Sequence, residues 1–131
     1  MGQLSCVVCG ATLRGVKAIP VSVEVIITSG IPSFSIVGMP DVAIQESRER
    51  VRAAIKASGF SMPSDKIVVN LAPGSLKKRG SGFDLPIALG ILVATKQISS
   101  IHIENTLVTG ELSLVGQARA TEGLLAFQYC A

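Results

Sequence analysis

The chain has 131 residues, the length of one domain of roughly 100–200 residues, so the sequence predicts one hydrophobic core. Hydrophobic residues make up 48% of it, charged residues 16%, and the mean hydropathy is +0.53, which excludes an intrinsically disordered chain. Aromatic residues make up only 4%, which argues against base-stacking platforms, while the net charge of +3 permits an anionic partner without requiring one.

The N-terminus and the apolar runs predict a cytoplasmic protein without a membrane span. No positive residue precedes Arg14, so the first residues do not form a secretory signal. The longest strongly apolar run without a charge, Leu85 to Thr95, is shorter than the roughly 20 residues of a spanning helix. Three cysteines, an odd number, fit a reducing compartment better than a disulfide framework.

Three β-type runs open the chain. Leu4 to Thr12 and Lys17 to Thr28 flank a turn at Gly15 and predict a hairpin. The second run alternates apolar and more polar residues with a period of two, which is typical of a half-buried strand. Phe34 to Val37 predicts a third short strand after a Gly-Ile-Pro turn. We therefore expect a three-stranded meander.

A helix and a buried strand follow. Asp41 is placed to cap the helix N-terminus, and Gly59 follows its C-terminus. Helical spacing predicts one buried face, made of Ile44, Ser47, Val51, Ala54, Ile55 and Ser58. Lys66 to Leu71 then predicts a buried strand.

The second half begins with a polar run, Ser75 to Gly82, which we expect to be an exposed loop. Asp84 is expected to cap a second helix, apolar on every side from Ile87 to Thr95 and therefore buried on most sides. Two further strands are expected over Thr106 to Leu112 and Leu114 to Arg119. A last helix is expected to start near Glu122, and because the chain stops at Ala131 we expect a fragment of a longer protein.

Residues that could carry metal or nucleotide chemistry are few. Cys6 and Cys9 have zinc-site spacing, but only Cys130 and His102 remain as further ligands, and strand residues three apart point to opposite faces. We expect buried or edge cysteines and no metal site. The sequence contains no G-x-x-x-x-G-K-[ST] and no G-x-G-x-x-G after a strand, so we expect no cofactor in this chain.

Two groups of basic residues are the candidate contacts for an anion or DNA. One recurs every four residues along the predicted first helix, and the other is a run before the second helix. They are Arg48, Arg52, Lys56, Lys77, Lys78 and Arg79. Like charges at this helical spacing repel by about 0.2–0.5 kcal/mol, so the stripe does not serve helix stability. Two interpretations stay open: ordinary solvated surface, or a surface for phosphate or an acidic partner.

The segment from Lys77 to Leu85 also stays open to two interpretations. Its Gly-Ser-Gly before a helix would expose backbone N–H groups suited to an anion, or would serve as a plain linker. Ser81 is a candidate nucleophile only with a Lys or His base beside it, and the local sequence supplies none at a readable spacing.

Three segments, in the same order, resemble the N-terminal domain of the magnesium-chelatase-like AAA+ proteins of the YifB and ComM type. They are SGIPSFSIVGMPDVAIQESRERVRAAIKASGF, KIVVNLAPGSLKKRGSGFDLPIALGIL and VTGELSLVGQARATEGLL, within a match over residues 3–127. The resemblance implies an α/β (α+β) fold of the ribosomal-S5-domain-2-like, Lon-protease-like class, a mixed sheet with helices packed on it. It implies a single Lon-like N-terminal domain over residues 3–131, truncated at its C-terminal helix, with the AAA+ ATPase domain of the parent absent.

The same resemblance implies a domain without catalytic residues. Lon-type proteases use a Ser–Lys dyad, whereas here the serine of Lys78 to Asp84 is offset or absent and no lysine lies near Gly123 to Ala126. The implied function is a non-catalytic accessory domain that helps a bacterial ATPase assemble or engage DNA. The alternative is a Lon-class serine hydrolase with Ser81 as nucleophile.

For the parent, the resemblance implies a cytoplasmic hexamer that uses ATP and magnesium for DNA branch migration in natural transformation. Its implied partners are the AAA+ module of the same chain, further copies and DNA, with no membrane. Insertion of magnesium into a porphyrin is not expected.

Overall fold

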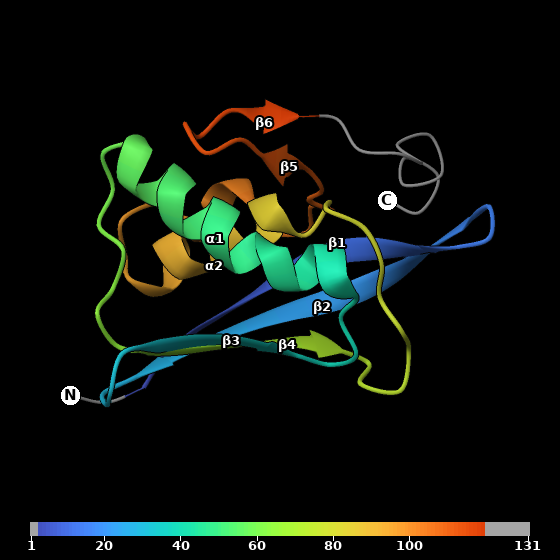
Figure 1. Cartoon of the computed structure of the whole chain (residues 1–131), viewed down its shortest axis with the longest axis horizontal. Helices are drawn as coiled ribbons and strands as arrows, with labels where there is room; N and C mark the ends of the chain where they lie inside the picture. The colour runs from blue at the N-terminus through green and yellow to red at the C-terminus, as the bar shows by residue number, and fades with distance from the viewer. Residues whose placement is uncertain (1–2, 120–131) are drawn as a thin grey trace.

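A four-stranded mixed sheet carries both long helices on one face, as Figure 1 shows for the computed structural model, which describes residues 3–119. This confirms the expected mixed α/β fold. The elements in chain order are β1 (Leu4–Arg14), β2 (Lys17–Thr28), β3 (Ser33–Val37), α1 (Val42–Ala57), β4 (Lys66–Ala72), α2 (Asp84–Ala94), the 3-10 helix η1 (Ser100–His102), β5 (Glu111–Leu112) and β6 (Ala118–Arg119).

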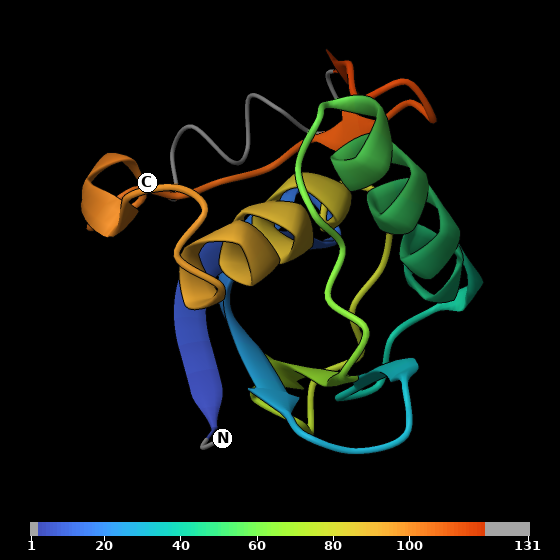
Figure 2. The same cartoon turned by 90° about the vertical axis from the view of Figure 1, so that its left-hand side faces the viewer.

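The strand order is β1-β2-β4-β3, so the expected meander is wrong. The hairpin of β1 and β2 is confirmed, but β4 inserts between β2 and β3. It runs antiparallel to β2 and parallel to β3, with Ser33 opposite Lys66. The helix between β3 and β4 allows this arrangement, because parallel neighbours need a long crossover connection. Figure 2 shows β3 as the outermost strand on the side of α1.

The core lies between this sheet and the helices. Alternate residues of the strands face the helices, and the most deeply buried are Val8, Val21, Val23, Val25, Ile27, Ile67, Val69 and Leu71. Helix α2 packs over β1 and β2, while α1 lies next to β3 (Figure 2). A Cβ added at Gly90 of α2 would lie 2.6 Å from Val25 Cγ2, so the helix approaches the sheet as closely as a glycine allows.

The first helix follows the sequence pattern. The Asp41 carboxylate accepts a hydrogen bond from the Ile44 amide at 2.9 Å, which confirms the expected N-cap. Gly59 has a φ of +84°, the left-handed conformation expected after a helix C-terminus. The expected buried face is confirmed except at Ser58, which is the exposed C-cap residue.

The last described part has less regular structure than expected. Both predicted strands shorten to the two-residue strands β5 and β6, which pair around a turn at Ser113 to Gly116. Strands this short form because only Leu112 packs into the core there, while Leu114 and Val115 are exposed. The helix expected from Glu122 lies outside the described residues. Within residues 3–119, no helix is long and apolar enough to cross a membrane.

Candidate anion-binding surface and its polar support

Lys78, the middle residue of the basic run, is fully buried, so the expectation of an exposed loop is wrong at this position. Its Nζ donates to the backbone carbonyls of Gly38, at 2.7 Å, and Pro73. Burial lowers the pKa of this ammonium. An ammonium enclosed by two carbonyls has no surface to offer a phosphate, and Lys78 therefore drops out of the candidate contacts.

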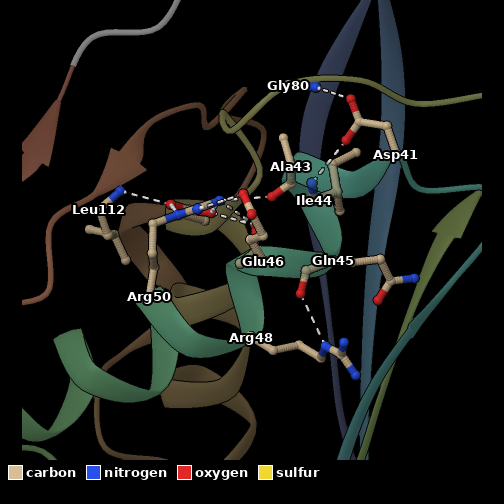
Figure 3. A network of polar contacts seen from close by, with 11 residues as sticks. Asp41, Ala43, Ile44, Gln45, Glu46, Arg48, Arg50, Gly80 and Leu112 are labelled. Carbon is tan, nitrogen blue, oxygen red and sulfur yellow. Dashed lines mark hydrogen bonds and ion pairs between the residues drawn. The ribbon is translucent and has the colours of Figure 1, made fainter.

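Backbone contacts hold the run against the beginning of α1. The Lys78 amide donates to Met39 O at 3.0 Å, and the Asp41 amide donates to Lys78 O at 3.1 Å. The second oxygen of the Asp41 carboxylate accepts from the Gly80 amide at 3.0 Å (Figure 3). Asp41 therefore fixes both the helix and the loop beside it.

The exposed cations of the run meet the end of the β1–β2 hairpin. Lys77 and Arg79 line a hollow of about 350 Å³ together with Arg14, Leu13, Ser75 and Leu76. The Arg79 amide donates to Thr12 Oγ1 at 3.0 Å, which anchors the loop to β1. We name Arg14, Lys77 and Arg79 the hairpin cluster. The sequence did not single out Arg14, because only the paired strands bring it to residues more than 60 positions away.

The stripe on α1 lies beside β3. Arg48 is half-buried and its Nε donates to Gln45 O at 3.0 Å (Figure 3). The guanidinium carbon of Arg52 lies 5.9 Å from the centre of the Phe34 ring, a cation–π distance. Lys56 is exposed. We name Arg48, Arg52 and Lys56 the helix stripe. Arg52 and Lys56 line a hollow different from that of the hairpin cluster.

A buried carboxylate, that of Asp84, joins three elements. Asp84 does not cap α2 as expected, since Phe83 is the N-cap residue and no side chain caps the helix. Its carboxylate instead accepts from Ser47 Oγ, from Arg50 Nε at 2.6 Å and Nη2 at 3.1 Å, and from the Leu112 amide at 3.0 Å (Figure 3). Asp84 thus links α1, α2 and β5.

Arg50 completes this polar network, which sequence reasoning missed. Its Nη2 also donates to Ala43 O at 2.8 Å, and its Nη1 lies 3.7 Å from Glu46. The hydrogen bond to Asp84 raises the pKa of the Arg50 guanidinium. Two signals were present in the sequence: a serine on the buried face of α1 and an acid before an apolar helix. Neither signal identifies Arg50 as the partner of Asp84.

The remaining candidates lie on different segments of the chain, apart from Cys6 and Cys9, which share β1, and Cys130 is outside the described residues. Ser81 is half-buried, and its nearest lysine in sequence, Lys78, is held by two carbonyls. Cys6 is half-buried, which raises the pKa of its thiol, and Cys9 is exposed. His102 lies in η1. Within residues 3–119, no three His, Cys, Asp or Glu residues are grouped as metal ligands.

Comparisons with known proteins agree on one family. The sequence model of subunit ChlI of Mg-chelatase matches residues 23–131. The chain is 42% identical to protein YifB of Escherichia coli over 112 residues, which are 86% of the chain and 22% of YifB. It is 42% identical to competence protein ComM of Haemophilus influenzae over 111 residues, 85% of the chain and 22% of ComM. The chain therefore spans about a fifth of the length of these curated relatives.

Proposed function

This chain belongs to the family of subunit ChlI of Mg-chelatase, and from that premise we propose that it is a non-catalytic accessory domain of a longer AAA+ ATPase and engages DNA phosphates through the hairpin cluster. The observation that carries the proposal is the convergence of Arg14, Lys77 and Arg79 on one hollow. One relative is named a competence protein, which supports a parent that works on DNA.

The chemistry of the hollow suits a phosphate backbone. Three cations from two segments line it, and neither Arg14, Lys77 nor Arg79 forms an ion pair within the described residues. Guanidinium groups contact phosphate oxygens in pairs, while a lysine supplies a point charge. Such contacts position a duplex without reading its sequence, so we expect little sequence preference.

The parent's further properties follow from the family resemblance. We propose a cytoplasmic hexamer in which the AAA+ module of the same chain binds ATP and magnesium and drives branch migration. Each domain would bind DNA weakly, and a ring of copies would raise the affinity through multivalency. The Ser81 hydrolase is the weaker alternative, because the lysine nearest to that serine in the sequence, Lys78, donates its ammonium to the carbonyls of Gly38 and Pro73.

Fluorescence anisotropy of a labelled DNA duplex with the full chain tests this proposal. Replacing Arg14, Lys77 and Arg79 by alanine should weaken binding and lower the slope of log affinity against log salt by about 2 to 3, since each phosphate contact contributes about 0.9. The matched control replaces Arg48, Arg52 and Lys56 by alanine, which removes the same charge. If both variants lose the same DNA affinity, net charge alone explains the binding. That result would contradict a DNA site at the hollow.

A further inference from the structure

We propose that the outer edge of β3, beside Arg52 and Lys56, binds an extended acidic peptide segment of a partner protein as an added strand. This surface is separate from the hairpin cluster. The inference rests on three observations: the orientation of the β3 backbone, the hollow at the start of that strand, and the charges that line it.

The backbone of β3 has one edge that no strand of the described chain covers. β3 is the last strand of the sheet and pairs with β4 alone. In a parallel ladder, alternate residues direct both their N–H and C=O to the same neighbour. The Ser33 amide donates to Asp65 O at 3.4 Å, so Ser33 faces β4 and Phe34 faces outward.

The carbonyl of the second outward-facing residue, Ile36, already has a side-chain hydrogen-bond partner. Ile36 has the same orientation as Phe34, and its carbonyl accepts a hydrogen bond from Gln45 Nε2 at 3.3 Å. A side chain of α1 therefore takes the place that a neighbouring strand would occupy. The open part of the edge lies at Phe34, at the first half of β3, and this is where a peptide main chain would pair.

A hollow of about 230 Å³ adjoins that open part. It is lined by Ser33 and Phe34 on β3, by Arg52 and Lys56 on α1, and by the loop from Met62 to Asp65. Within the described residues, Arg52 and Lys56 form no ion pair. A side chain of an added strand would project toward α1 and meet these two cations. Charge complementarity therefore selects aspartate or glutamate.

Main-chain geometry favours a peptide over a nucleic acid at this place. The outward N–H and C=O of Phe34 form a donor and acceptor pair that matches another peptide backbone, which a phosphate backbone lacks. An alternating acidic strand places its carboxylates on one face, where they can meet Arg52 and Lys56.

The experiment uses a fluorescein-labelled, end-blocked octapeptide of alternating glutamate and valine, titrated with the full chain. We expect saturable binding that weakens with salt, and a loss of about fivefold or more in the double variant Arg52→Gln/Lys56→Gln, because two ion pairs are removed. The matched control is Arg14→Gln/Lys77→Gln, which removes the same charge from the hairpin cluster and should bind the peptide as the wild type does.

Two N-methylated peptides test strand addition without changing the protein. One carries methyl groups on the odd amides and the other on the even amides. In an added strand, only one set points at β3, so one peptide should lose binding and the other should keep it. Equal binding by both would overturn strand addition. A DNA duplex that displaces the peptide and binds Arg52→Gln/Lys56→Gln more weakly than Arg14→Gln/Lys77→Gln would overturn the choice of partner.

Discussion

Lys78 illustrates how one residue in a uniform polar run takes a different role from its neighbours. The sequence Lys-Lys-Arg indicates three exposed cations, yet the middle ammonium donates to the carbonyls of Gly38 and Pro73. Which residue turns inward depends on a backbone turn 40 positions away, at Gly38, where an added Cβ would meet the Leu71 backbone. Local sequence patterns do not contain that information.

Replacing Lys78 by methionine should destabilise the fold at neutral pH by about 1–3 kcal/mol, because buried carbonyls lose their donor. Burial lowers the folded-state pKa of Lys78 below its ordinary value of about 10.4. Between the lowered pKa and about 10.4 the unfolded state binds the extra proton, so this residue's contribution to the free energy of unfolding rises with pH. The difference in unfolding free energy between wild type and Lys78→Met should therefore widen from neutral pH toward pH 10.

Urea unfolding at several pH values measures this difference. Lys77→Met is the matched control, because Lys77 is an exposed neighbour of the same type. If the difference in unfolding free energy between wild type and Lys78→Met stays constant with pH, Lys78 has its ordinary pKa in the folded protein. A Lys78→Met variant as stable as Lys77→Met at neutral pH would contradict the role of its hydrogen bonds.

At the scale of elements, Asp84 is the junction of α1, α2 and β5. It is fully buried and accepts from Arg50, Ser47 and the Leu112 amide. Replacing Asp84 by alanine should lower the free energy of unfolding by about 3–5 kcal/mol, because the guanidinium loses its buried partner. Glu46→Ala removes the exposed acid 3.7 Å from the same arginine and should cost at most about 1 kcal/mol. Similar losses in the two variants, measured by urea unfolding, would contradict a structural role specific to Asp84.

The sequence predicts elements with local signals better than it predicts their arrangement. The limits of β2 and the cap of α1 follow from alternation and from Asp41, which are local properties. The position of β4 between β2 and β3 depends on long-range pairing, which a periodic pattern does not encode. The hairpin cluster was found only in part for the same reason, since Arg14 joins Lys77 and Arg79 across strands.

At the scale of the whole molecule, two basic surfaces occupy different ends of one sheet. Arg14 of the hairpin cluster is the last residue of β1, next to the hairpin tip that Figure 1 shows, whereas Arg52 and Lys56 of the helix stripe share a hollow with Ser33 and Phe34 of the opposite edge strand, β3. These two surfaces hold six of the twelve Lys and Arg residues of the chain, in places with different backbone surroundings. The two proposed sites, one for DNA phosphates and one for a peptide, therefore lie on different parts of the domain.

The place of β4 in the sheet also sets an order of assembly in time. The β1–β2 hairpin closes from neighbouring residues, which takes microseconds, whereas β3 has no partner strand until residues 66–72 are available. On the ribosome, β3 therefore emerges before β4, the strand with which it pairs, because α1 lies between them in the sequence. During refolding followed by pulsed hydrogen exchange, the amides that pair β1 with β2 should become protected before the β4-facing amides of β3. Simultaneous protection of all four strands would show instead that the sheet forms in one step around β4.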